Sequence, residues 1–246
     1  MTIQEKIKKK IKDRRFFRMK VLIACEESQE VCKAFRELGH EAFSCDILEC
    51  SGGHPEWHIQ DDVLKHLDDC WDLMIAHPPC TYLCVTSNRW LKEQPARKSG
   101  KLVGKERVKA QQEAVNFFIE LWMAKIPFIA IENPVGIMST RFIKPHQIIH
   151  PYYFGDAVSK KTCLWLKNLP LLRKTNVVQA EYHTTKSGKK YPKWSMIDAC
   201  KIQDLEKRAS IRSKTFLGIA KAMANQWGNF VEDKLTKNKK EIKNEK

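Results

Sequence analysis

Two short apolar runs that each end at proline constrain the fold of this chain more than any other feature of its sequence. The first run, Leu73–Ala76, stops at Pro78 and Pro79, which can continue neither a strand nor a helix. The second run, Ile126–Ile131, stops in the same way at Pro134. Short apolar runs with such ends are typical of buried parallel strands, which predicts an α/β sheet. Ligands bind beyond the carboxyl ends of these strands, so the residues that follow are candidates for a functional site.

A thiol and a carboxyl group follow these two runs. Cys80 comes after the first run, and Glu132 with Asn133 comes after the second. If the two strands are neighbours, a nucleophile and an acid face one cleft. A lone cysteine is more often a buried and inert thiol, and its pairing with Glu132 reverses that preference. Cys84 is a weaker candidate for the same role.

Hydrophobic periodicity extends the α/β pattern along the rest of the chain. Apolar residues at helical spacing predict helices over 31–38, 108–124 and 216–228. Further strands are predicted over 20–24, 41–46, 57–63 and 162–166, and a strand and turn over 150–155. Strand, loop and helix at 20–38 form the opening of a nucleotide-binding half.

The motifs around Cys80 and Glu132 resemble those of a known enzyme family. Pro78-Pro79-Cys80 is similar to the Pro-Cys motif of the DNA cytosine-5 methyltransferases, and Glu132-Asn133-Pro134 is similar to their Glu-Asn-Val motif, in the same order. Over residues 19–230 the chain resembles the short phage and prophage proteins of this kind. The resemblance implies an α/β, Rossmann-like S-adenosylmethionine-dependent methyltransferase fold, with a mostly parallel twisted sheet and helices on both faces.

The resemblance also implies a reaction: methylation of cytosine carbon 5 in DNA through a covalent adduct of Cys80. Glu132 would share or donate a proton at ring nitrogen 3, and Asn133 would orient the base or brace its loop. Lys160 and Lys161 fall where the family usually has Gln-x-Arg-x-Arg, whose basic groups hold the base carbonyl. Lys161 is the expected substitute, although a lysine lacks the bidentate fork of arginine.

S-adenosylmethionine is the cofactor that the resemblance implies. The loop Cys25–Glu30 contains no glycine, where the family normally has several. Ser28 is expected to cap the following helix, Asp46 to hold the ribose, and Asp62 to accept from the adenine amino group. Glu26 either bonds the α-amino group or is an exposed acid, and Asp46 is equally explained as a turn or cap residue. The candidate cofactor-binding residues are Cys25, Glu26, Ser28, Asp46, Asp62, His77 and Pro78.

The charge of the chain suits a polyanionic partner. The formal net charge is +15, and a surplus of this sign favours binding to nucleic acid. DNA, double- or single-stranded, is the expected partner. Two polar segments interleave cations with tryptophan, although each could be a plain surface loop or hairpin. Their candidate contacts are Arg89, Trp90, Arg97, Lys98 and Lys101 in the first and Lys189, Lys190 and Trp194 in the second.

The expected organisation is a basic arm over 1–18, a catalytic domain over 19–230 with a small recognition insertion near 167–212, and a charged tail over 231–246. No run is long enough to cross a membrane and no secretory signal is recognised, so no membrane partner is expected and the protein is expected in the cytoplasm. If a phage encodes it, this is the cytoplasm of the bacterial host. A monomer is expected. The nine cysteines are expected to be reduced thiols. Cys45, Cys50, His54 and His58 lack metal-site spacing, so no metal is expected.

Three alternatives stay open. An exocyclic-amine methyltransferase has a loop similar to His77-Pro78-Pro79-Cys80, but it needs an acceptor at the first position and a stacking ring at the fourth. The thiol chemistry could instead serve a folate-dependent hydroxymethylation, a modified phage base, RNA or a free nucleotide. The chain could also be a catalytically inactive nucleic-acid-binding protein.

Overall fold

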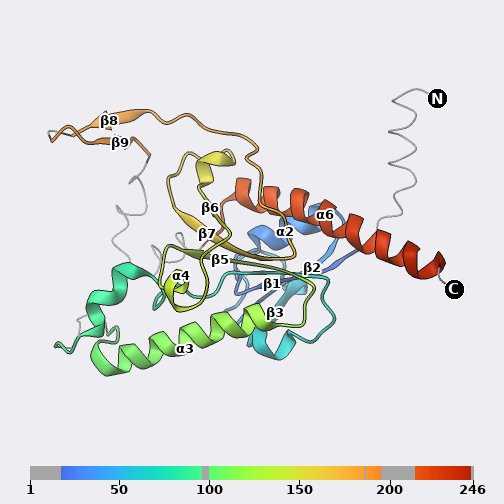
Figure 1. Ribbon diagram of the computed structural model, residues 1–246, viewed down its shortest axis with the longest axis horizontal. Coiled ribbons are helices and arrows are strands. Elements are labelled where there is room, and N and C mark those ends of the chain that lie inside the picture. Colours follow the sequence, from blue (N-terminus) through green and yellow to red (C-terminus); the bar gives the residue numbers. More distant parts are fainter. Residues whose placement is uncertain (1–17, 96–99, 186, 195–213, 245–246) are drawn as a thin grey trace.

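A single mixed sheet forms the centre of the computed structural model, which describes residues 18–95, 100–185, 187–194 and 214–244 (Figure 1). Seven strands pair in the order β3-β2-β1-β4-β5-β7-β6. The neighbours from β3 to β5 are parallel, and β7 runs antiparallel to both β5 and β6. The strands are β1 (Lys20–Ala24), β2 (Glu41–Asp46), β3 (His58–Gln60), β4 (Leu73–Ala76), β5 (Phe128–Pro134), β6 (Gln147–Ile149) and β7 (Thr162–Lys167).

Helices cover both faces of this sheet. In Figure 1, α3 lies below the sheet, and α2 and α6 lie above it. The long helices are α2 (Glu30–Glu37), α3 (Gly104–Met123) and α6 (Leu217–Asn244), and α4 (Met138–Arg141) is a single turn. Short 3-10 turns are η1 (Pro55–Trp57), η2 (Val63–His66), η3 (Val85–Leu91) and η4 (Pro151–Tyr153), and β8 (Tyr182–Thr184) pairs with β9 (Lys190–Pro192) in a hairpin. The predicted Rossmann-like α/β fold is confirmed.

Two apolar layers hold the helices to the sheet. Side chains alternate along a strand, so Val21 and Ile23 of β1 pack in the layer that contains Phe35 of α2 and Trp227 of α6. The intervening residues of β1, Leu22 and Ala24, pack in the layer that contains Phe118 of α3. Each large side chain that is fully buried contributes about 1.5–3 kcal/mol. The continuous apolar sequence of the central strands follows from burial on both faces.

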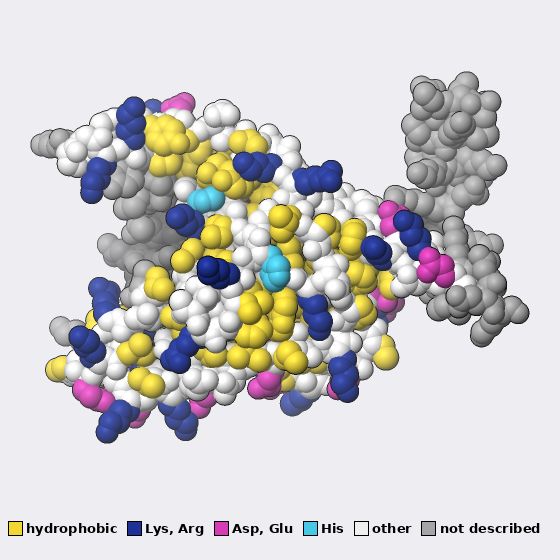
Figure 2. Space-filling model, viewed as in Figure 1, with side chains coloured by type: hydrophobic (Ala, Val, Ile, Leu, Met, Phe, Trp, Pro, Cys, Tyr) yellow, Lys and Arg dark blue, Asp and Glu magenta, His cyan; other side chains and the backbone are white. Residues whose placement is uncertain are grey.

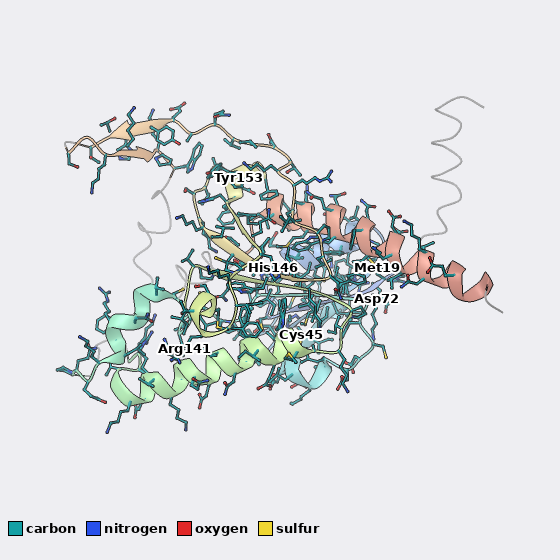
Figure 3. All side chains as sticks on the ribbon, in the orientation of Figure 1. Met19, Cys45, Asp72, Arg141, His146 and Tyr153 are labelled. Atoms are coloured by element: carbon teal, nitrogen blue, oxygen red, sulfur yellow. The ribbon has the colours of Figure 1, made fainter. Side chains whose placement is uncertain are left out.

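The direction of strand succession reverses between β1 and β4. From β1 the chain proceeds to β2 and β3 on one side, and from β4 it proceeds to β5 on the other. At the amino ends, a carboxylate oxygen of Asp72 accepts from the backbone N–H of Lys20 at 2.8 Å, close to Met19 in Figure 3. The opposite, carboxyl ends of β1 and β4 therefore form the crevice in which doubly wound sheets bind their ligands.

Several predicted boundaries differ from the structure. Of the strand and turn predicted over 150–155, the turn is present, but the strand is not: β6 lies earlier, at Gln147–Ile149, and Pro151 begins a 3-10 turn because proline has no N–H for a ladder. The second apolar run does not end at Ile131, since β5 continues to Pro134 and pairs there with β7. Helix α6 continues past residue 228 to Asn244. Within the described ranges, no helix combines the length and apolarity that a membrane span requires.

Candidate functional site

Cys80 lies on a tight turn directly beyond β4. The backbone N–H of His77 still donates to Ala24 at 2.9 Å, and the two prolines that follow end the pairing with β1. The carbonyl of Cys80 then accepts from the N–H groups of Leu83 and Cys84, both at 3.1 Å. The side chain of Cys80 is exposed. The strand thus presents a thiol to the crevice at its carboxyl end.

Two side chains of helix α3 donate hydrogen bonds to this turn. Arg107 is 2 % exposed, and its guanidinium donates to the carbonyls of Thr81 at 3.2 Å and Leu102 at 3.1 Å. Gln111, also buried, donates to the carbonyl of Tyr82 at 3.0 Å. Hydrogen bonds from a charged donor are stronger than neutral ones, so Arg107 fixes the backbone beside the nucleophile. A buried arginine on the apolar side of a helix was not singled out from the sequence.

The segment after β5 is joined to the same turn. Cys84 and Gly136 form an isolated antiparallel bridge, and the N–H of Ile137 donates to the carbonyl of Leu83 at 2.8 Å. A β-carbon at position 136 would collide with that carbonyl, so only glycine allows the approach. The loops after β4 and β5 therefore form one unit.

Glu132 and Asn133 reach from β5 to the loop before Cys80. An oxygen of the Glu132 carboxylate lies 3.2 Å from Nδ1 of His77, and these two side chains are only 14 % and 9 % exposed. The amide of Asn133 donates to the carbonyl of Pro78 at 2.7 Å. The charge of Glu132 is close enough to raise the pKa of the Cys80 thiol. The structure thus brings the two predicted motifs together at the ends of neighbouring strands.

Other neighbours lower the pKa of Cys80 more than Glu132 raises it. A hydrogen bond from the Cys84 thiol is the largest influence, burial and Glu132 oppose it, and the charge of Lys160 adds to it, so that the pKa falls to about 7. The thiolate of Cys80 is therefore more populated at neutral pH than that of an ordinary cysteine. By contrast, burial raises the pKa of Cys32 to about 12 and that of Cys163 to about 11.

Glu132 is ionised in this arrangement. Burial by itself would raise the pKa of the carboxyl group, but the hydrogen bond with His77 and the charge of Lys160 outweigh it and the pKa falls below its usual value. At neutral pH this carboxylate is a proton acceptor. A role as proton donor requires that it first gain a proton.

Lys160, rather than the predicted Lys161, faces Glu132. It lines a small cleft with Glu132, Thr162, Lys214, Thr215, Phe216 and Ile219. Lys161 is exposed, and its charge acts on His150 and Cys163 instead. Successive residues of an extended chain point to opposite sides, so Lys160 and Thr162 share one side and Lys161 takes the other. The structure therefore places Lys160, and not the predicted Lys161, beside Glu132.

These neighbouring lysines offer a matched test of the cleft. Lys160→Ala should raise the pKa of Cys80, because it removes a cation that stabilises the thiolate. Lys161→Ala should leave that pKa unchanged. The rate of alkylation of Cys80 by iodoacetamide, measured against pH, reports the pKa without any substrate. Equal profiles for the two variants would contradict the assignment of Lys160.

Three predicted cofactor residues gather at the carboxyl ends of β1, β2 and β3. Cys25 follows β1, and the charges of Asp46 and Asp62 both contribute to the raised pKa of its thiol, after burial. One carboxylate oxygen of Asp46 accepts from the N–H of Leu48 at 2.9 Å, and one of Asp62 accepts from Leu64 at 3.0 Å. Each acid thus has a local turn or cap role beside the crevice. Pro78, another candidate, contributes its carbonyl to Asn133.

Glu26 caps helix α2 from within the preceding loop. Its two carboxylate oxygens accept from the N–H groups of Val31 at 2.8 Å and Cys32 at 3.1 Å, and the side chain is buried. The reading of Glu26 as an exposed acid is wrong. Ser28 is buried and does not cap the helix, because Gln29 occupies the cap position, and the Gln29 side chain makes no capping hydrogen bond to the helix. Cys25 and Gln29 adopt the left-handed conformation, both at φ 59°, without being glycine.

Loss of this cap should destabilise the fold. Glu26→Ala leaves two buried N–H groups without acceptors, so the free energy of unfolding should fall by about 1–3 kcal/mol. Urea denaturation followed by circular dichroism measures the change. Glu37→Ala, at the exposed carboxyl end of the same helix, is the control and should have little effect. Equal free energies of unfolding for Glu26→Ala and the native protein would show that the cap does not stabilise the fold.

The predicted nucleic-acid contacts that the structure describes lie in η3, before α3, and in or just after the β8–β9 hairpin. Arg89 and Lys101 are exposed, and the guanidinium of Arg89 lies 4.8 Å from the ring of Trp90. Lys189 and Lys190 are exposed at the β8–β9 hairpin, which projects from the body in Figure 1. Trp194 is half-buried, and Arg97 and Lys98 lie outside the described residues. Lysine and arginine outnumber acids on the face shown in Figure 2.

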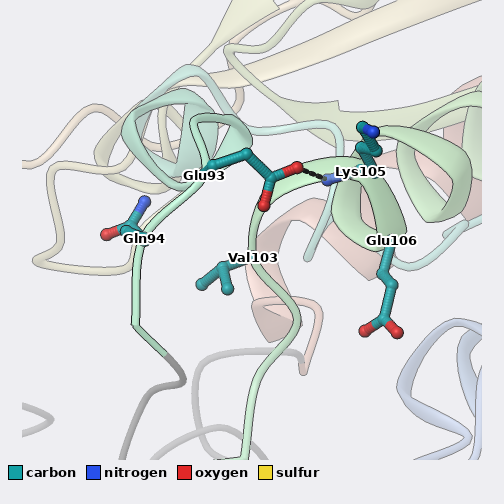
Figure 4. A pocket seen from close by; sticks show the side chains of 5 residues that line it. All are labelled: Glu93, Gln94, Val103, Lys105 and Glu106. Carbon is teal, nitrogen blue, oxygen red and sulfur yellow. Dashed lines mark hydrogen bonds between the residues drawn. The ribbon is translucent and has the colours of Figure 1, made fainter.

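A second hollow is separate from this site. It is lined by Glu93, Gln94, Val103, Lys105 and Glu106, and Glu93 accepts from the N–H of Lys105 at 3.0 Å (Figure 4). None of the predicted site residues lines it. No thiol or hydroxyl side chain lines it, so the β4–β5 centre remains the candidate functional site.

Comparison with known proteins gives limited information. No protein-family model matches the chain, and no curated protein matches it. Among solved structures, the chain is similar to one from an E. coli prophage that is provisionally described as a DNA modification methyltransferase. The identity is 12 %, the TM-score is 0.40, and the match covers 79 % of this chain and 69 % of the other. A likeness of this size assigns no activity to the chain.

Proposed function

We propose that this chain transfers a methyl group from S-adenosylmethionine to carbon 5 of cytosine in DNA, through a covalent adduct of Cys80. One observation carries the proposal: an exposed thiol with a pKa of about 7 lies beside a largely buried carboxyl group at the ends of neighbouring parallel strands. A thiolate that is populated at neutral pH, exposed and fixed in place is suited to covalent catalysis.

The thiolate would activate the base. Carbon 5 of cytosine is a poor nucleophile until another group adds at carbon 6. Cys80 forms the sulfur–carbon 6 bond, and the displaced electron pair is taken up as Glu132 gives a proton to ring nitrogen 3, which leaves an enamine with a nucleophilic carbon 5. S-adenosylmethionine, when bound, would supply the electrophilic methyl group for that carbon. Loss of the carbon 5 proton to a base then expels Cys80 as thiolate, and ring nitrogen 3 returns its proton to Glu132.

Glu132 must be protonated for this step, although its pKa is low in the absence of substrate. A base bound in the cleft directs the lone pair of nitrogen 3 at the carboxyl group, and an ionised carboxylate facing that lone pair is repelled. A hydrogen bond made only by the acid form raises the pKa. We therefore expect Glu132 to gain a proton, from His77 or from solvent, as the base binds. Asn133 would brace the loop through Pro78.

The loop after β1 suits a cofactor without phosphate. Dinucleotide-binding folds hold a pyrophosphate at the amino end of the first helix, but here the carboxylate of Glu26 fills that position. S-adenosylmethionine has no phosphate and carries positive charges, which suits a crevice bordered by Asp46 and Asp62. Nε2 of His77 is buried with no hydrogen-bond partner among the described residues, and it offers a polar contact in the same crevice. These observations support the cofactor and count against a dinucleotide.

DNA is the proposed substrate because cations border the cleft and the surface. Lys160 lies within the cleft, where it is the candidate to hold the base carbonyl, and the candidates Arg89, Lys101, Lys189 and Lys190 could contact phosphates. A base stacked in a duplex cannot reach Cys80. The target nucleotide must therefore be flipped out of the helix or belong to a single strand.

Product analysis tests the proposal. The protein is incubated with DNA and S-adenosylmethionine labelled in the methyl group, and the DNA is digested to nucleosides. Labelled 5-methylcytosine is expected; label on an exocyclic amine, or no transfer despite cofactor binding by calorimetry, would contradict the proposed chemistry. The same reaction with folate-bound one-carbon units would reveal hydroxymethylation instead.

A further inference from the structure

Cys84 is a second thiol at the proposed site, and the proposed mechanism gives it no chemical task. It lies one turn beyond Cys80, and its N–H donates to the carbonyl of Cys80 at 3.1 Å. The two thiols are also in hydrogen-bond contact with each other. Cys80 is exposed and Cys84 is half-buried. The chain therefore holds two reduced sulfur atoms together at the cleft.

The backbone between them can accommodate a bond. Disulfides require two α-carbons within about 4.4–6.8 Å, a separation that one helical turn provides. The segment Cys80–Cys84 is a single turn between the prolines that precede it and the 3-10 turn η3, which begins at Val85. Thr81 is exposed and Tyr82 is half-buried at the surface. A small adjustment of this turn leaves the pairing of β4 with β1 and β5 intact, because that pairing ends at Ala76.

The two cysteines also have the properties of an oxidation-sensitive pair. Oxidation-sensitive cysteines are accessible, readily ionised and placed next to a second thiol that can resolve the first product. Cys80 meets the first two conditions and Cys84 supplies the third. Cys25, Cys32 and Cys45 are different, because burial raises the pKa of each thiol. Selective oxidation at the Cys80 turn follows from this contrast.

We infer that Cys80 and Cys84 form a reversible disulfide, which withdraws the exposed nucleophile from reaction. A low-molecular-weight disulfide is the oxidant. The Cys80 thiolate attacks one of its sulfur atoms, forms a mixed disulfide and releases one thiolate. Cys84 loses its proton to solvent and attacks the sulfur of Cys80, which releases the second small thiolate. The two protein thiols thus supply two electrons, and the small disulfide is reduced to two thiols.

Peptide mapping tests the inference without DNA or cofactor. The full chain is treated with oxidised glutathione, free thiols are alkylated, and the protein is digested without reduction. Chymotrypsin cleaves after Tyr82, which separates Cys80 from Cys84 unless a disulfide joins the two pieces. In the native protein the joined pieces are expected, and dithiothreitol should release them and restore alkylation of Cys80.

Cys84→Ser is the matched variant. It keeps the nucleophile but cannot resolve the mixed disulfide, so glutathione on Cys80 should accumulate at least about tenfold above the native level. Cys70, which is exposed and distant in the fold from this turn, is the internal control and should carry glutathione equally in both proteins. Equal accumulation on Cys80 in the two proteins, or no joined pieces, would overturn the inference. Either result is independent of whether the chain methylates DNA.

Discussion

Cys80→Ser is expected to lower kcat/KM for methyl transfer by at least about a thousandfold, since a serine hydroxyl at neutral pH does not add to carbon 6. The native thiol has a pKa of about 7, whereas serine supplies no comparable population of anion. Transfer of labelled methyl groups to DNA measures the loss. Cofactor affinity by calorimetry should be unchanged, because the side chain of Cys80 is not one of the candidate cofactor contacts.

Cys84→Ser is the control for this variant. A hydroxyl can still donate a hydrogen bond to the Cys80 thiolate, so methyl transfer should persist at a rate within about tenfold of the native one. If Cys84→Ser is as inactive as Cys80→Ser, the second thiol also takes part in the chemistry and the proposed roles are incomplete. If Cys80→Ser retains full activity, no covalent adduct is needed and the proposed mechanism fails.

The second large effect is expected at Glu132. Glu132→Gln removes the proton given to ring nitrogen 3 and should lower kcat/KM by about 10²–10⁴-fold, the range typical of general acid catalysis. Glu120→Gln, on the exposed side of α3, is the matched control and should leave kcat/KM unchanged. An active Glu132→Gln enzyme would remove the acid from the mechanism.

The pH dependence separates the two groups. The Cys80 thiolate is the reactive form, and its population rises as pH increases through about 7. Glu132 must be protonated, and its lowered pKa means that the acid form becomes scarcer as pH rises. Between the two pKa values these changes offset each other, so the native kcat/KM should be flat there and fall above about 7. In Glu132→Gln the thiolate alone sets the profile, so kcat/KM should instead rise as pH increases through about 7.

Most of the sheet could be predicted from the sequence because its strands are buried on both faces. Continuous apolar runs such as Leu73–Ala76 have few other interpretations, and proline marks their ends. The continuation of β5 through Glu132 could not be predicted in this way. It depends on β7, which lies about thirty residues later in the chain and supplies the partner for a polar segment.

The candidate site was predictable in its centre and less so in its surroundings. Cys80 and Glu132 follow directly from strand ends and motif spacing. Which of Lys160 and Lys161 faces Glu132 depends on the alternation of side chains along an extended segment. That alternation is known only once Thr162 is placed in the sheet, and no local sequence pattern gives it. The capping role of Glu26 depends on a loop in which Cys25 and Gln29 adopt the left-handed conformation although neither is glycine. Arg107 was missed because its use is to bind carbonyls of a distant turn.

The most direct test of the central claim is covalent trapping. DNA containing 5-fluorocytosine cannot lose the group at carbon 5, so an enzyme that adds a thiolate to carbon 6 remains attached after methyl transfer. With S-adenosylmethionine present, we expect a denaturation-resistant complex, and peptide mass spectrometry should place the base on Cys80. A protein that methylates ordinary cytosine in the same DNA but forms no such complex, or forms it through another residue, would contradict the account.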